Sequence, residues 1–134
     1  MKRLYNNHYI EEQRNYRGLQ YTILFNIGGY RTAYIDVGDS ILKNVDYCSI
    51  DLDVHGGLTY GEDHLPFSTE STDRWYIGWD YAHYEDGVDT VTTNKYFGVE
   101  KLAASFSFTY FGHCYTLEEV REECREAINQ LLEM

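Results

Sequence analysis

Hydrophobic and polar residues alternate along four stretches of the chain, and this period of two predicts β-strands. The first two stretches, residues 19–27 and 30–37, are separated by Gly28 and Gly29. Because glycine accepts the positive φ of a tight hairpin turn, we expect these two stretches to form a β-hairpin. Residues 45–55 and 74–82 show the same alternation and predict two further strands.

Alternation also predicts which side chains share a face. In residues 50–55, Ile50, Leu52 and Val54 point one way, and Asp51, Asp53 and His55 the other way. In residues 74–82, the expected core face carries two tryptophans and two other large side chains: Trp75, Ile77, Trp79 and Tyr81.

The C-terminal residues 116–134 have the period of an amphipathic helix instead. Thr116 and Glu119 have the spacing of a capping box, in which each side chain accepts a hydrogen bond from a free backbone N–H. The expected buried face comprises Leu117, Val120, Cys124, Ala127, Ile128 and Leu131. The rest reads as a polar N-terminal segment (1–18), two loops (61–73 and 83–94) and an ambiguous stretch (95–115).

These elements predict one α+β domain over residues 1–134, with an antiparallel β-sheet and the long C-terminal α-helix packed on one face. A chain of 134 residues is long enough to bury a core without disulfides or metal. The three cysteines cannot all pair within the chain, which favours free thiols in a reducing compartment. No segment has the apolar length of a signal peptide or a membrane span, so we expect a cytoplasmic protein without membrane contact.

The formal net charge of −11 is concentrated in the middle of the chain. Residues 36–90 contain 13 acidic side chains and two basic ones, whereas the remaining residues are balanced. A protein that binds DNA or RNA directly needs a basic surface, so direct nucleic-acid binding is not expected. An acidic face is compatible with a basic protein partner, with a cation, or simply with solubility.

Candidate chemistry lies in two blocks. The first combines Asp51, Asp53 and His55 with Gly56 and Gly57. Two carboxylates and an imidazole on one strand face are compatible with a solvated surface, with a hydrogen-bonded ligand, or with a metal or acid–base pair. The D-x-D-x-H spacing matches no standard metal motif, so we expect no structural metal.

The second block contains Trp79, Asp80 and His83. Asp80 or His83 could complete a ligand shell with the first block, and Trp79 is interpreted as a core residue or as a platform on which a base stacks. The chain contains no complete hydrolase, metalloprotease, Walker or dinucleotide-binding motif. We therefore nominate no catalytic residue and no cofactor, and enzymatic activity is not the favoured interpretation.

Residues 51–60 (DLDVHGGLTY) and 75–83 (WYIGWDYAH) are the most distinctive stretches of the chain. Together with an acidic C-terminal helix that carries Glu123 and Cys124, they resemble a group of small phage and prophage proteins. The resemblance extends over residues 29–132, and residues 51–60 are its most specific part. It implies a viral source, a location in the cytoplasm of an infected bacterium, and an accessory role, for which counter-defence is the commonest known class.

The leading hypothesis is that the protein binds and sequesters a nucleotide-derived immune signal of the host. The expected ligand-binding residues come from both blocks: Asp51, Asp53, His55, Gly56, Gly57, Tyr60, Trp79, Asp80 and His83. One alternative is an acidic decoy that binds and inhibits a host defence protein, and another is a small metal-dependent hydrolase that uses the Asp/His face. A homo-oligomer is compatible with each hypothesis.

Overall fold

The predicted hairpin forms the centre of the sheet in the structure, a computed structural model that describes residues 2–83, 85–98 and 112–134. β3 (Leu19–Asn26) and β4 (Tyr30–Asp36) pair antiparallel from Gln20↔Asp36 to Asn26↔Tyr30. Gly29 takes a φ of +91° in the turn, and a Cβ there would lie 2.4 Å from the Val88 side chain. The turn therefore requires glycine for its backbone and for its close packing.

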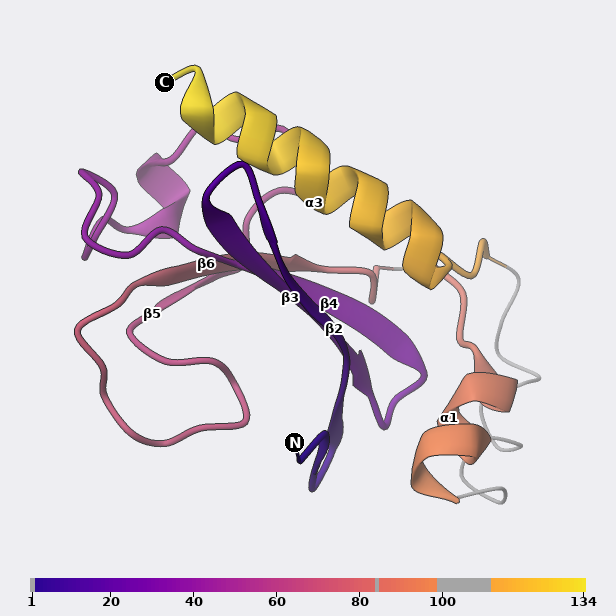
Figure 1. Cartoon of the computed structure of the whole chain (residues 1–134). Coiled ribbons are helices and arrows are strands. Elements are labelled where there is room, and N and C mark those ends of the chain that lie inside the picture. The colour runs from indigo at the N-terminus through magenta and orange to yellow at the C-terminus, as the bar shows by residue number, and fades with distance from the viewer. Residues whose placement is uncertain (1, 84, 99–111) are drawn as a thin grey trace.

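Six strands make one antiparallel sheet in the order β1-β2-β3-β4-β6-β5. The outer strands are β1 (Leu4–Tyr5), β2 (His8–Tyr16), β5 (Tyr60–Glu62) and β6 (Tyr76–Asp80). One long helix lies across one face of this sheet, and a short helix lies beyond its end (Figure 1). They are α3 (Leu117–Leu132) and α1 (Thr90–Phe97). The α+β prediction is confirmed.

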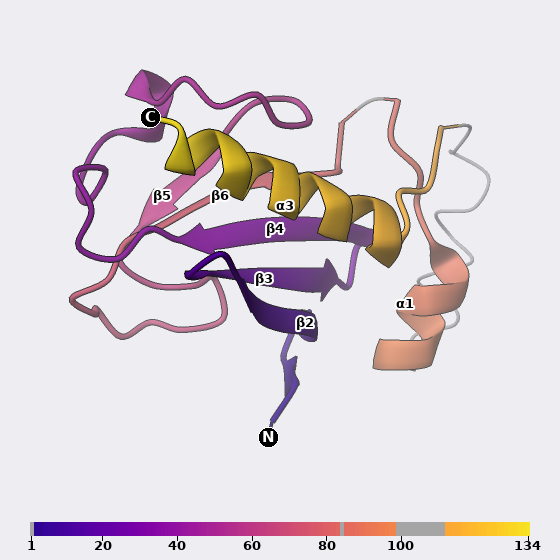
Figure 2. The ribbon, with the colours of Figure 1, turned by 45° about the horizontal axis from the view of Figure 1, so that its top comes forward.

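α3 begins where the sequence predicts. Thr116 Oγ1 accepts a hydrogen bond from the Glu119 backbone N–H at 3.2 Å, and Glu119 Oε1 accepts one from the Thr116 N–H at 3.0 Å. The helix follows β4 and β3 across the sheet (Figure 2). Of its predicted buried face, Val120, Cys124, Ala127 and Ile128 are inaccessible to solvent, whereas Leu117 and Leu131 are partly buried against the core.

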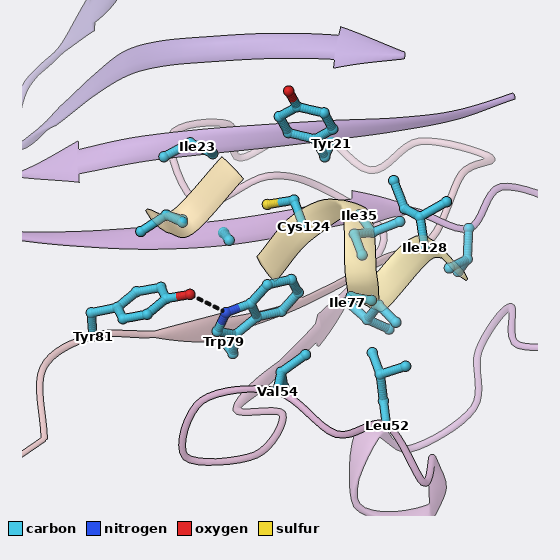
Figure 3. Close-up of a cluster of buried hydrophobic side chains, with 14 residues drawn as sticks. Tyr21, Ile23, Ile35, Leu52, Val54, Ile77, Trp79, Tyr81, Cys124 and Ile128 are labelled. Carbon is cyan, nitrogen blue, oxygen red and sulfur yellow. Dashed lines mark hydrogen bonds between the residues drawn. The ribbon is translucent and has the colours of Figure 1, made fainter. Parts of the chain in front are cut away.

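The main core lies between α3 and the sheet. Figure 3 shows that its side chains come from the central strands, from residues 52–54 and from α3. Trp79 is 1% exposed, and its Nε1–H donates to the Tyr81 hydroxyl at 3.0 Å. The interpretation of Trp79 as a core residue is confirmed. The opposite face of the sheet carries a smaller cluster built on Ile10, Leu24, Tyr34 and Leu65.

The strand predicted at residues 45–55 is wrong. Tyr47–Ser49 form a 3-10 helix, residues 50–54 belong to no strand, and His55 and Gly56 lie in a turn. The backbone of Asp53 bonds to a side chain of α3 instead: its N–H donates to Gln130 Oε1 at 2.8 Å, and its carbonyl accepts from Gln130 Nε2 at 2.9 Å. The predicted alternation survives, because Leu52 and Val54 are buried and Asp53 is exposed.

The polar N-terminal segment, residues 1–18, for which no strand was predicted, contains β1 and β2. A bulge shifts the pairing of β2 with β3 between Ile10 and Glu12. It places Glu11 beside Arg31, with bonds of 2.6 and 3.0 Å, and Glu12 beside Arg121, with two bonds of 2.8 Å. Charged side chains can therefore lie inside this strand because each has a guanidinium partner.

Two loop predictions need smaller corrections. In the loop predicted at residues 61–73, the first two residues belong to β5, and the loop begins after them. The loop predicted at residues 83–94 ends at α1, whose first turn is capped by Asp89. The ambiguous stretch 95–115 falls mostly on residues 99–111, which lie outside the described residues.

Candidate functional site

The two sequence blocks meet at a buried carboxylate that the sequence did not single out. His55 Nε2 lies 2.9 Å from both carboxylate oxygens of Asp86, and His83 Nδ1 lies 2.9 Å from Asp86 Oδ2. The Asp86 side chain is only 4% exposed, whereas those of His55 and His83 are 24% and 38% exposed. Two imidazoles thus cover a buried carboxylate and separate it from solvent.

Neighbouring groups fix both rings. The His55 ring stacks on Tyr81 with centroids 4.7 Å apart and an interplanar angle of 10°, and Tyr115 lies at the same distance. The His83 ring packs over Gly56, where an added Cβ would lie 2.3 Å from ring atoms. Gly56 also has a φ of +70°, so both its backbone and its missing side chain permit the contact.

The electrostatics of the centre favour an ionised Asp86. Burial alone would raise the pKa of this carboxyl. Hydrogen bonds from the backbone N–H of His83, at 2.9 Å, and from the two imidazoles outweigh that effect and hold the pKa below its usual range. The site therefore combines a buried negative charge with two imidazole rings.

An acidic pocket of about 520 Å³ opens beside His55. Its lining combines two tyrosines with four glutamates of the first turns of α3: His55, Tyr81, Tyr115, Thr116, Glu118, Glu119, Glu122 and Glu123. Among the described residues, no lysine or arginine lines it. We call it the acidic pocket below.

Glu123 connects the pocket to the core. Its carboxylate accepts a hydrogen bond from the Tyr81 hydroxyl and another, at 3.2 Å, from the backbone N–H of His55. Burial raises the pKa of the Tyr81 hydroxyl, and its hydrogen bond to Glu123 raises it further, so Tyr81 stays a donor. The other glutamates of the pocket, Glu118, Glu119 and Glu122, are exposed to solvent.

A second pocket, of about 400 Å³, lies over β4 and β6 and has a different character. We call it the tyrosine pocket. Its lining holds three tyrosines and one carboxylate: Tyr30, Thr32, Tyr34, Thr59, Tyr60, Trp79, Asp80 and Ala82. Thr59 Oγ1 donates to Asp80 Oδ2 at 3.0 Å, which fixes this carboxylate at the pocket wall.

The nine residues predicted to bind a ligand therefore do not form one site. His55, Gly56 and His83 come together around Asp86, whereas Tyr60, Trp79 and Asp80 line the tyrosine pocket. Between the two groups, His83 Nε2 lies 3.8 Å from Asp80 Oδ1.

The remaining predicted residues line neither pocket. Asp51 and Asp53 are exposed, and Gly57 takes a φ of +80° in a turn. Gly78 of β6 leaves no open space for a ligand, because the ring of Tyr34 would lie 2.5 Å from a Cβ added there.

Sequence reasoning missed Asp86, Tyr115 and Glu123 as site residues. Asp86 lies in a loop 31 residues beyond His55, where no period marks its direction. Glu123 offered a weak signal, because it flanks Cys124 on the predicted helix and must border the buried face.

Comparison with protein-family models, with curated proteins and with solved structures finds no match to this chain. The resemblance to small phage proteins therefore stays a prediction from the sequence. No helix among the described residues is long and apolar enough to cross a membrane.

Proposed function

We propose that this protein binds a positively charged surface of another protein through the acidic pocket and acts as a decoy. In the counter-defence role that the sequence resemblance implies, the partner is a host defence protein with a basic groove. The proposal rests on one observation: four glutamates and two tyrosines line a pocket of about 520 Å³ into which no described lysine or arginine projects.

The chemistry of the pocket suits a lysine or arginine side chain. A cationic head group entering it would meet carboxylates, which form charge-assisted hydrogen bonds, and the rings of Tyr81 and Tyr115, which attract cations. The net charge of −11 supports the same interpretation, since it steers a basic partner toward the protein over about 8 Å at physiological salt. A phosphate group would be repelled by the same carboxylates.

A peptide of eight arginines is a suitable probe. We expect calorimetry to detect binding that weakens steeply as salt is raised. Glu118→Gln/Glu122→Gln should weaken it at least about fivefold, about 1 kcal/mol. The matched control, Glu70→Gln/Asp73→Asn, removes the same two charges from the exposed loop after β5 and should have a much smaller effect. Equal losses in both double variants would mean that net charge, not the pocket, binds the peptide, and would contradict the proposal.

A second candidate function, sequestration of a nucleotide-derived signal, is favoured by the tyrosine pocket. Tyr30, Tyr34 and Tyr60 offer rings on which a base can stack, and the Asp80 carboxylate can accept from an amino group or a ribose hydroxyl. Among the described residues, Asp80 is the one acidic side chain that lines this pocket, so repulsion of phosphates is weaker there than in the acidic pocket.

The two functions separate in a thermal-shift experiment with cyclic dinucleotides. Under the second function, a cyclic dinucleotide raises the melting temperature with little dependence on salt, and Tyr60→Leu removes the shift while Glu118→Gln/Glu122→Gln keeps it. Absence of any shift, together with salt-sensitive binding of the arginine peptide, would leave the decoy function as the supported one.

A further inference from the structure

We infer that His55, His83 and Asp86 form a binding site for one divalent transition-metal ion, with zinc as the ion that the ligand set suits best. The candidate ligand atoms, one from each side chain, all lie within 4.8 Å of one another. The inference is independent of the proposed function, because it concerns the centre behind His55 and not the glutamates of α3.

The distances match what a metal would require. A zinc ion bound at about 2.0–2.2 Å by nitrogen and oxygen ligands in tetrahedral geometry keeps those ligand atoms roughly 3.3–3.6 Å apart. His55 Nε2 and His83 Nδ1 both lie 2.9 Å from Asp86 Oδ2. Each of the two imidazole nitrogens would therefore need to move only a few tenths of an ångström away from Asp86 Oδ2 to admit the ion.

The ligand types point to the same class of ion. Two imidazoles and one carboxylate are a common set for zinc with an open fourth position, and also suit iron(II) and manganese(II). A carboxylate only accepts hydrogen bonds, so each imidazole nitrogen that faces Asp86 carries a proton when no metal is bound. When a metal binds, a neutral imidazole can move this proton to its other ring nitrogen, which frees the nitrogen that faces Asp86 as a ligand, while Asp86 remains a carboxylate.

The surroundings already hold the ligands in place. Tyr81 stacks on His55 at 4.7 Å, and the backbone N–H of His83 donates to Asp86 Oδ2 at 2.9 Å. If His83 binds through Nδ1, its Nε2 faces Asp80 Oδ1, which lies 3.8 Å away. A carboxylate behind the second nitrogen is the usual outer partner of a metal-bound histidine, since it fixes the ring and increases its basicity.

The fourth position would be open toward water or a ligand, because His55 also lines the acidic pocket. The metal would join residues 55–57 to residues 83–86, two loop segments that the described backbone does not pair with each other. The sequence predicted no structural metal because D-x-D-x-H lacks a standard spacing. In the folded chain the third ligand is Asp86, and Asp51 and Asp53 point elsewhere.

Titration of zinc chloride into chelator-treated protein tests the site. We expect about one equivalent to bind saturably, with an affinity that falls at least about tenfold in His83→Gln, since even loss of an outer partner typically costs that much. Cobalt(II) should give the visible absorption of a tetrahedral site in the wild type and lose it in the variant. His83 is partly exposed, so this variant is expected to fold, which circular dichroism checks.

The control variant is His64→Gln. It removes the histidine of the other described group with metal-ligand spacing, Glu62, Asp63 and His64, and should leave zinc binding unchanged. Two outcomes would overturn the inference: no saturable binding of zinc to the wild type, or binding that His83→Gln leaves intact. Either result would identify the centre as a carboxylate held between two histidines by hydrogen bonds alone.

Discussion

Two places in the described part of the chain contain buried carboxylates, and they differ in what neutralises the negative charge. At the bulge of β2, Glu11 and Glu12 each bind a guanidinium through two hydrogen bonds. In the loop after β6, the Asp86 carboxylate is held instead by two imidazoles, those of His55 and His83. Both places bury negative charge, but only the second does so with partners that can lose a proton.

The difference indicates which centre stabilises the fold and which has side chains suited to binding a proton or a metal ion. A guanidinium keeps its charge at every accessible pH and matches a carboxylate with a rigid fork of donors. An imidazole can be neutral, can change tautomer and can bind a metal. The arginine-paired glutamates connect β2 to β4 and to α3, whereas Asp86 lies in a loop, and its partner His55 lines the acidic pocket.

The strongest test of this comparison is Arg31→Met. The side chains of Arg31 and Glu11 are 7% and 2% exposed, so the substitution leaves a buried, uncompensated charge. We expect the free energy of unfolding in urea to fall by about 3–5 kcal/mol. Adding Glu11→Leu to the variant should recover much of the loss. A fall in the unfolding free energy of less than about 1 kcal/mol, the usual contribution of an exposed ion pair, would contradict this expectation. The buried pair would then stabilise the fold no more than a surface ion pair does.

Lowering the pH is expected to have a smaller effect on the free energy of unfolding. Burial alone would raise the pKa of the Glu12 carboxyl, but hydrogen bonds from Arg121 and Tyr21 outweigh it and hold the pKa below its usual range. A carboxyl with a lowered pKa in the folded state stabilises the fold fully above the unfolded pKa of about 4.3, and this stabilisation is lost as pH falls through the folded pKa.

The measurement is the difference in unfolding free energy between the wild type and Glu12→Gln. This difference should shrink as the pH is lowered from about 6 to about 3, because protonation removes the advantage of the native carboxylate. A difference that stays constant over this range would show that the charge of Glu12 contributes nothing to stability.

The smallest effect is expected at the histidine centre. His55→Gln should change the unfolding free energy of metal-free protein by less than about 1 kcal/mol, because the side chain is partly exposed and glutamine can still donate to Asp86. Val120→Ala, at a fully buried position of α3, should cost about 2 kcal/mol in the same assay. If His55→Gln proved as costly as Val120→Ala, His55 would be a structural residue, and the distinction between the two centres would fail.

The sequence predicted the parts of the fold whose signals are local. The hairpin of β3 and β4, the core face of β6 and the capped start of α3 each follow from periodicity or from adjacent residues. β2 was missed because its bulge breaks the period of two, and because its glutamates have arginine partners that lie 20 and 109 residues away.

The candidate site was predicted only in part, for the same reason. The sequence singled out His55, Gly56 and His83, and the structure brings them together. It also grouped Asp51 and Asp53 with them on the assumption of a shared strand face, but these side chains are exposed. Asp86, around which the histidines gather, has no local signal at all.

The paired hydrogen bonds between Gln130 and the backbone of Asp53 have a consequence for how this sequence can change over time. A glutamine amide carries a donor and an acceptor side by side, as a peptide group does, so Gln130 takes the place of a neighbouring strand. Only the main chain of Asp53 takes part, and main-chain atoms are common to all residues. Position 53 should therefore tolerate many substitutions, whereas few side chains could replace the glutamine at position 130. Asp53 is the more noticeable of the two in the sequence, but its side chain is easier to replace than that of Gln130.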